Sequence, residues 1–342
     1  MTELEPGELV ARGEAAARER WPQAAIRGLE PLQGGISSLT YSARLTGTGL
    51  DTDPDERAVV FKVAPPGLAP VRNRDVLRQA RVLRALHGAP GVQVPEVLVQ
   101  DGGSPPFFVM EFVAGEAYEP KWDVSASPPS PGLVDARARA AAVMLARLQA
   151  VDPAAVGLAG EPVLSPAQEL ERWGLLFATA GDELRGDELS LREALARQIP
   201  EPGAARILHG DYRLGNMQFS GERLAAIIDW ELWSLGDPRH DLAWLMAFAD
   251  PIQQRVSRRD AANQTAADAM PGPGELLAEY LSTAGLDVPA DLNWFLALCY
   301  YKLGATMSVL AKRNRRQAEP DPGLELVAAT TPPMIERALA LL

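Results

Sequence analysis

The sequence predicts an α+β protein of two parts, a smaller one with an antiparallel sheet at residues 1–112 and a larger, mostly helical one at residues 113–342. Short apolar or alternating segments, bounded by Gly, Pro and Asp, are concentrated before residue 113. Longer segments with apolar residues at helical spacing dominate after residue 132. With 342 residues, 47% of them hydrophobic, the chain can bury one large core or two smaller ones.

The expected elements follow from these two periodicities and from the turn residues between them. In the smaller part we expect a helix at 4–21, strands at 29–32, 41–45 and 58–63, a helix at 71–87, and a hairpin of 97–99 with 105–113. In the larger part we expect helices at 133–151, 166–180, 189–198, 241–248, 275–284, 290–314 and 331–342. Prolines predict a loop at 117–132 and a mobile, polar insertion at 250–274.

Composition excludes several classes of protein. The net charge is −12, with −2 before residue 113 and −10 after it, so no basic stripe for nucleic acid is present. The acidic second part suits either a cationic ligand or a well-solvated surface. The N-terminal residues show no leader segment, and no stretch of roughly 18 residues stays apolar and uncharged, so we expect a cytoplasmic protein with no membrane partner. Cys299, the single cysteine, lies in an apolar segment and predicts a buried thiol.

Residues 207–241 carry the side chains best suited to chemistry. An apolar segment at 207–208 is followed by Asp211, a polar loop, a Ser-Gly turn at 220–221, and a second apolar segment that ends at Asp229. This order indicates a strand, a loop and a hairpin that bring Asp211, Asn216 and Asp229 into one small volume. One carboxylate could accept a proton there, while an amide oxygen and a second carboxylate bind a hard cation such as Mg²⁺.

The motif HGDxxxxN at 209–216, with Asp229 following, has the spacing of the protein-kinase catalytic loop, with Gly210 where those enzymes usually carry Arg. Together with IDW at 228–230 and GDPxxDLA at 236–243, this glycine version resembles the aminoglycoside phosphotransferase and choline kinase-like family. The longer segment LHGDYRLGN at 208–216, with DWE at 229–231 and LGDP at 235–238, is similar to the branch that is also found fused to acyl-CoA dehydrogenases. The resemblance covers approximately residues 34–313.

The resemblance implies a two-lobed protein kinase-like fold that binds ATP and Mg²⁺ between its lobes. It implies that Asp211 is the catalytic base for an acceptor hydroxyl. Arg213 would neutralise charge on the transferred phosphoryl group. Asn216 and Asp229 would hold the magnesium ion.

Two further motif residues, His209 and Asp241, would brace the catalytic loop by hydrogen bonds. Asp241 could also be the N-cap of the helix expected at 241–248. In addition, His209, Asp211 and His240 copy the order of a two-histidine, one-carboxylate iron site. Such sites lie on all-β scaffolds, which the helical second part does not match.

In the smaller part the resemblance implies a nucleotide site. Lys62, a charged residue inside an apolar strand, would pair with the α- and β-phosphates; the alternative is a strand-edge lysine whose amine reaches water. Backbone groups from Glu111 to Val113 would bind adenine, and Met110 would line its pocket or simply fill the core. A Gly-Gly pair at 34–35 alone indicates an ordinary turn. In this family the same segment is a phosphate-binding loop, whose candidate residues here are Gly34, Gly35, Ser37 and Ser38.

The chain departs from the kinase pattern at Gln79, where a glutamate usually pairs with the strand lysine. Either Asp75 substitutes for it, or Lys62 is held only by nucleotide and a neutral glutamine. We therefore expect an ATP-dependent phosphotransferase that moves the γ-phosphoryl group to a small-molecule hydroxyl. The alternative is a catalytically weak or inactive nucleotide-binding protein of the same fold. The sequence leaves the acceptor open among amino sugars, amino alcohols and hydroxyacyl compounds, and it predicts no oligomeric state.

Overall fold

The computed structural model describes residues 5–32, 38–49, 56–69, 71–253 and 260–342 and divides into two compact units. The first unit comprises Met1–Gly115, Val156–Leu158 and Ala225–Trp233. The second comprises Glu116–Ala155, Ala159–Leu224 and Ser234–Leu342.

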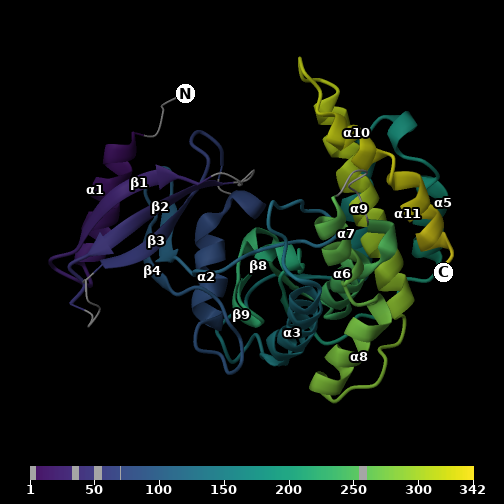
Figure 1. The fold of residues 1–342 in the computed structure, drawn as a ribbon, viewed down its shortest axis with the longest axis horizontal. Helices are drawn as coiled ribbons and strands as arrows, with labels where there is room; N and C mark the ends of the chain where they lie inside the picture. Colours follow the sequence, from purple (N-terminus) through teal and green to yellow (C-terminus); the bar gives the residue numbers. More distant parts are fainter. Residues whose placement is uncertain (1–4, 33–37, 50–55, 70, 254–259) are drawn as a thin grey trace. The chain divides into compact units, whose positions relative to one another are not determined.

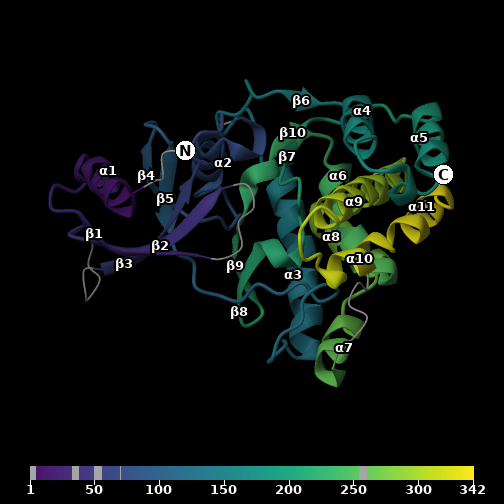
Figure 2. The same ribbon diagram turned by 90° about the horizontal axis from the view of Figure 1, so that it is seen from above.

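The first unit is built on a five-stranded antiparallel sheet in the order β1-β2-β3-β5-β4. Figure 1 labels β1, β2, β3 and β4 of this sheet, and Figure 2 labels β5. Its strands are β1 (Ala25–Pro31), β2 (Leu39–Thr46), β3 (Glu56–Val63), β4 (Val97–Asp101) and β5 (Phe107–Glu111). Val59, Phe61 and Val63 of β3 pack in one hydrophobic cluster with Leu9 and other residues of α1 (Pro6–Arg18). Because side chains alternate along a strand, Lys62 points to the opposite face of the sheet.

The helix of the first unit that follows β3 begins later than expected. We predicted a helix over residues 71–87, whereas α2 spans Val76–Leu86 and follows a short 3₁₀ helix, η1 (Arg72–Arg74). Asp75 is the N-cap of α2, because its Oδ1 accepts a hydrogen bond of 3.0 Å from the amide of Arg78. Capping by a carboxylate satisfies an amide at the helix start and fixes the boundary there.

The second unit is mostly helical (Figures 1 and 2). Its helices are α3 (Pro131–Ala150), α4 (Pro166–Phe177), α5 (Glu188–Arg197), α6 (Arg239–Ala249), α7 (Ala261–Asp268), α8 (Pro273–Ala284), α9 (Leu292–Asn314), α10 (Pro322–Ala328) and α11 (Thr331–Leu339). Helix α9 packs against α4, α5, α6, α10 and α11 and is buried along most of its length, including Cys299. By length and composition α9 could span a membrane, although Lys302 lies within it, but 83% of its most apolar window is buried inside the protein.

Short strands position the residues that precede the catalytic motif. β6 (Val163–Leu164), β10 (Ser234–Gly236) and β7 (Arg206–Leu208) form a three-stranded sheet with β10 in the centre. β8 (Met217–Ser220) and β9 (Arg223–Ile227) form the expected hairpin, and the chain passes from the second unit to the first within β9. β7 ends immediately before His209, so the sheet fixes where the catalytic motif begins.

Two predictions for the larger part were wrong, and one helix was missed. Residues 250–274 are not all irregular, because α7 forms within them and is capped by Asp260, whose Oδ1 accepts a 2.8 Å hydrogen bond from the amide of Asn263. Helix α10 was not expected. Asp241 is not an N-cap, because α6 begins at Arg239, two residues earlier.

Candidate active site

The catalytic loop, residues 209–216 of the second unit, is held in place by hydrogen bonds that its backbone amides donate to side chains. The buried carboxylate of Asp241 accepts hydrogen bonds from the amides of His209 at 2.6 Å and Gly210 at 3.0 Å. Gly210 has a φ of 84°, a left-handed conformation that favours glycine and explains why this residue stands at that position. The amide of Asp211 in turn donates to Nδ1 of His209 at 3.2 Å. His209 and Asp241 therefore brace the loop.

Asp211, the expected base, is held on both carboxylate oxygens. Its Oδ1 accepts a hydrogen bond from Nε1 of Trp244 at 2.9 Å. Its Oδ2 accepts from Nδ2 of Asn216 at 2.7 Å and from Nε of Arg213 at 3.2 Å. Burial alone would raise the pKa of Asp211, but the positive charge of Arg213 and the other donors outweigh it and hold the pKa below its ordinary value. The carboxylate is thus ionised at neutral pH and oriented, and its side chain is still 24% exposed.

The amide orientation of Asn216 suits a cation ligand. Its Nδ2 donates to both the backbone carbonyl and the carboxylate of Asp211, at 2.9 and 2.7 Å. These bonds occupy the nitrogen end of the side chain, so the oxygen Oδ1 is left for a hard cation. Asn216 closes a one-turn 3₁₀ helix, η3 (Leu214–Asn216), which fixes its place five residues after Asp211.

Arg213 lies between two carboxylates and two aromatic rings. Besides the bond to Asp211, its Nη1 is 3.9 Å from Oε2 of Glu119. Its guanidinium carbon lies 5.5 Å from the ring centre of Trp122 and 5.7 Å from that of Phe248, within the range of cation–π attraction. We expected the Arg213 guanidinium to neutralise charge on the phosphoryl group. In this arrangement it is paired instead with Asp211, the expected base.

Glu119 is a residue that the motifs did not indicate. Its side chain is fully buried, and its Oε2 accepts a 3.1 Å hydrogen bond from the amide of Gly215 in the catalytic loop. Burial raises the pKa of Glu119 to about 7, although Arg213 and the Gly215 amide oppose this. The nearby carboxylates of Asp123 and Asp211 reinforce the rise. No sequence signal identifies this glutamate, since it lies in the segment that we predicted as a proline-rich loop.

Lys62 of the first unit contacts Ser38 and Asp229. Its Nζ lies 3.2 Å from Oδ1 of Asp229 and 3.4 Å from Oγ of Ser38. The Lys62 side chain is only 11% exposed, whereas that of Asp229 is 40% exposed. Asp229 has a φ of 63°, an uncommon conformation for a residue other than glycine and one that is frequent at functional sites. Lys62 is therefore not a strand-edge lysine reaching into water.

Neither expected substitute for the kinase glutamate contacts Lys62 among the described residues. Asp75 caps α2, and the buried side chain of Gln79 donates to the carbonyl of Asn73 at 3.3 Å. Asp229 and Ser38 are the recorded partners of Lys62 instead.

The structure describes some of the remaining candidates of the nucleotide site and not others. Met110 is buried in the sheet. Glu111 directs its Oε1 to the amide of Glu96, at 3.0 Å, so its side chain has a structural partner. The amide of Val113 has no recorded hydrogen bond within the described chain. Gly34, Gly35 and Ser37 lie outside the described residues, unlike Ser38.

The structure offers no counterpart to the iron-site alternative. His240 lies in the core, where its ring packs edge-on against Phe295 with the centroids 5.0 Å apart. Among the described residues, no group of three His, Cys, Asp or Glu side chains is placed to hold a metal ion.

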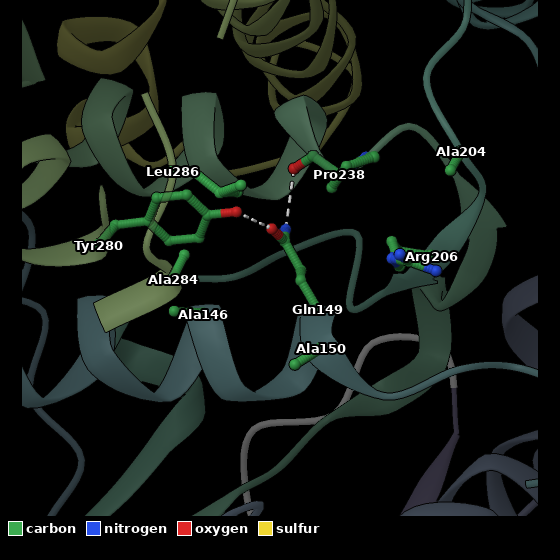
Figure 3. Close-up of a pocket in the computed structure, with 9 residues that line it drawn as sticks. All are labelled: Ala146, Gln149, Ala150, Ala204, Arg206, Pro238, Tyr280, Ala284 and Leu286. Atoms are coloured by element: carbon green, nitrogen blue, oxygen red, sulfur yellow. Dashed lines mark hydrogen bonds between the residues drawn. The ribbon is translucent and has the colours of Figure 1, made fainter. Parts of the chain in front are cut away.

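A separate pocket of about 270 Å³ lies in the second unit, between α3, α8 and the start of β7 (Figure 3). Its polar lining is largely satisfied internally: the Tyr280 hydroxyl donates to Oε1 of Gln149 at 2.6 Å, and Nε2 of Gln149 donates to the Pro238 carbonyl at 2.8 Å. None of the predicted site residues lines it.

Comparison with known proteins shows the family. The model of the phosphotransferase enzyme family, APH, matches residues 28–277, which is most of the chain, so the chain belongs to this family. Acyl-CoA dehydrogenase family member 10 of Mus musculus is 26% identical over 293 residues. That match covers 82% of this chain but only 26% of the mouse protein, so the chain spans about a quarter of that relative.

Solved structures show the fold. A candidate aminoglycoside phosphotransferase from Ralstonia eutropha JMP134 aligns with a TM-score of 0.73 at 23% identity, over 96% of each chain. A thermostable mutant of aminoglycoside phosphotransferase APH(4)-Ia, in a ternary complex with ADP and hygromycin B, aligns with a TM-score of 0.59 at 13% identity, over 95% of this chain and 98% of that one. The chain therefore has the protein kinase-like fold of this family, as the motifs predicted.

Proposed function

We propose that the protein transfers the γ-phosphoryl group of ATP to a hydroxyl group of a small molecule. The observation that carries this proposal is the state of Asp211. Its carboxylate is oriented on both oxygens, has a lowered pKa and is 24% exposed. An oriented, ionised and accessible carboxylate in the catalytic loop of this family is suited to accept a proton from a hydroxyl.

In the proposed reaction the acceptor hydroxyl lies against the Asp211 carboxylate. The acceptor oxygen forms a bond to the γ-phosphorus while the bond to the bridging oxygen of ADP breaks, and ADP leaves with that electron pair. The hydroxyl proton passes to Asp211. Trp244 and Asn216 keep the carboxylate in place, which lowers the entropic cost of reaching the transition state.

The donor set fits magnesium, which the family of enzymes acting on ATP implies. We propose Asn216 and Asp229 as its ligands, since both offer oxygen atoms and Asp229 is partly exposed. When bound, magnesium neutralises part of the charge on the ATP phosphates. We propose that Lys62 contributes positive charge to the α- and β-phosphates, and that it exchanges Asp229 for them when nucleotide binds.

We propose that the adenine ring is bound by backbone groups near Val113, whose amide has no recorded hydrogen bond within the described chain. Gly34, Gly35, Ser37 and Ser38 are proposed to surround the phosphates. The acceptor is open. The APH(4)-Ia structure contains hygromycin B, whereas the mouse relative is named as an acyl-CoA dehydrogenase, so amino sugars, amino alcohols and hydroxyacyl compounds are all reasonable.

One observation favours the alternative of an inactive nucleotide-binding protein. Gln79 contacts Asn73 rather than Lys62, so the usual kinase ion pair is missing. Purified protein should therefore be assayed for ATP turnover with magnesium against panels of aminoglycosides, amino alcohols and hydroxyacyl-CoAs. Stimulation by one panel, abolished in Asp211→Ala, supports the proposed function. Equal turnover by wild type and Asp211→Ala with every acceptor would overturn it.

A further inference from the structure

Several charged side chains are buried in the second unit, and Glu119 is one that touches the catalytic loop. Its Oε2 holds the amide of Gly215 at 3.1 Å and faces Arg213 at 3.9 Å. Its Oε1 is buried and has no hydrogen-bond partner within the described chain. A buried carboxylate with an unsatisfied oxygen destabilises a fold. The residue therefore needs an explanation other than stability.

Arg213 is the charged group that Glu119 shares with the catalytic base. The guanidinium donates to Oδ2 of Asp211 through Nε, while its Nη1 faces Glu119. Two carboxylates thus compete for one cation, and the position of that cation depends on both. Whatever draws Arg213 toward Glu119 weakens its hold on Asp211.

Gly215 provides the space that this arrangement needs. A Cβ atom built on Gly215 would lie 2.1 Å from Nη1 of Arg213 and 3.4 Å from Cβ of Glu119. The guanidinium therefore packs directly on the backbone of the catalytic loop, at the residue whose amide Glu119 holds. Glu119, Gly215 and Arg213 form one contiguous unit of contacts.

We propose that Glu119 is a positioning residue for phosphoryl transfer, a role that rests on the proposed function. Glu119 fixes the Gly215 amide and shares the Arg213 guanidinium with Asp211. It thereby keeps Arg213 from pairing with the base alone. Without the Glu119 carboxylate, Asp211 becomes the only carboxylate recorded within ion-pair distance of Arg213 among the described residues. A base in a tighter ion pair accepts a proton less readily. We expect the loss of the Glu119 carboxylate to lower kcat and to leave KM for ATP unchanged. The reason is that the contact between Lys62 and Ser38, which are proposed to bind nucleotide, lies in the other unit and is not altered.

The experiment is a double-mutant cycle of wild type, Glu119→Gln, Arg213→Met and the double variant. For each protein, kcat and KM for ATP are measured at pH 8, where Glu119 is mostly ionised, with the acceptor that the panels identify, or by intrinsic ATP hydrolysis when no panel stimulates turnover. We expect Glu119→Gln to lower kcat about tenfold, as loss of a group that orients a functional residue does, with KM for ATP unchanged. We expect the double variant to be no slower than Arg213→Met.

Two further variants separate positioning from packing. Glu119→Asp keeps the charge and should recover part of the kcat lost in Glu119→Gln. Glu188→Gln is the matched control, because Glu188 is a buried glutamate of the same unit that accepts a 3.2 Å hydrogen bond from Tyr301, away from the catalytic loop. We expect it to leave kcat unchanged.

Thermal unfolding of the same four proteins at pH 8 measures the coupling between Glu119 and Arg213 without an activity assay. We expect Glu119→Gln to raise Tm more in the Arg213→Met background, where the buried carboxylate has lost its cation, than in wild type. Equal fold-losses in kcat in both backgrounds, or wild-type kcat in Glu119→Gln, would overturn the proposal, as would additive Tm shifts. If wild type transfers no phosphoryl group, the proposed function fails, and the Tm cycle still decides whether Glu119 and Arg213 are coupled.

Discussion

Replacing Glu119 by Gln should change how the stability of the protein depends on pH. Burial raises the folded-state pKa of Glu119 to about 7, against an ordinary value of 4.5. The folded state therefore binds a proton that the unfolded state has released between these two values. Stability is thus lost as pH rises from 4.5 to 7 and is level above that range. At about 1.4 kcal/mol per pKa unit, the loss is about 3 kcal/mol.

The Gln side chain carries no titratable proton, so the variant should lack this loss. The assay is urea unfolding of wild type and Glu119→Gln at pH 5, 6, 7 and 8. We expect the unfolding free energy of the variant, minus that of wild type, to increase by about 2.5 kcal/mol from pH 5 to pH 8, slightly less than the full loss because part of it lies below pH 5.

A second buried glutamate provides the control for this measurement. For Glu169, burial would raise the pKa, but the charge of Lys302 outweighs it and lowers the pKa below 4.5, so its titration lies outside this window. The difference between Glu169→Gln and wild type should therefore stay constant from pH 5 to pH 8. A constant difference for Glu119→Gln as well would refute the reasoning, since it would mean that Glu119 does not hold a proton in the folded protein at pH 5.

Three further predictions concern the loop and the lysine. Trp244→Phe removes the donor to Oδ1 of Asp211 and should lower kcat about tenfold, measured by steady-state kinetics; because Trp244 is buried, the smaller ring should also lower Tm, measured by thermal unfolding. Gly215→Ala forces Arg213 to move, because the new Cβ would lie 2.1 Å from its Nη1; kcat should fall at least as far as in Trp244→Phe. Lys62→Met should weaken ATP binding about tenfold, measured by calorimetry, since it removes the positive charge proposed to contact the phosphates. An unchanged affinity would contradict the role of Lys62.

Most of the fold was predictable because its signals are local. Alternation along β3 predicted both the strand and the unusual position of Lys62 within it. The long apolar periodicity at 290–314 predicted helix α9, which the structure shows to be buried along most of its length. Helices α7 and α10 were missed, because the segments in which they lie are polar and contain prolines, as loops do; α7 is capped by Asp260, a signal that the prediction did not use.

The candidate site was predictable where residues share one motif, and at Lys62, whose charge is unusual inside an apolar strand. Asp211 and Asn216 are five residues apart on one loop, and the structure joins them by a 2.7 Å hydrogen bond. Trp244 had an available signal, since it lies one helical turn after the motif residue Asp241 and so on the same side of α6. Glu119 had none, because its contact with Gly215 joins residues 96 positions apart. Pairing across such separations follows from tertiary structure and not from local pattern.

Direct detection of a phosphorylated acceptor by mass spectrometry, after incubation with ATP and magnesium, tests the central claim most directly. We predict that wild-type protein forms a phosphorylated product with a member of one acceptor panel. We predict that Asp211→Asn, which keeps the shape of the side chain but removes its charge, binds ATP normally and forms the product on the order of 10³-fold more slowly, as loss of a general base does. Product formation by Asp211→Asn at the wild-type rate would contradict the account.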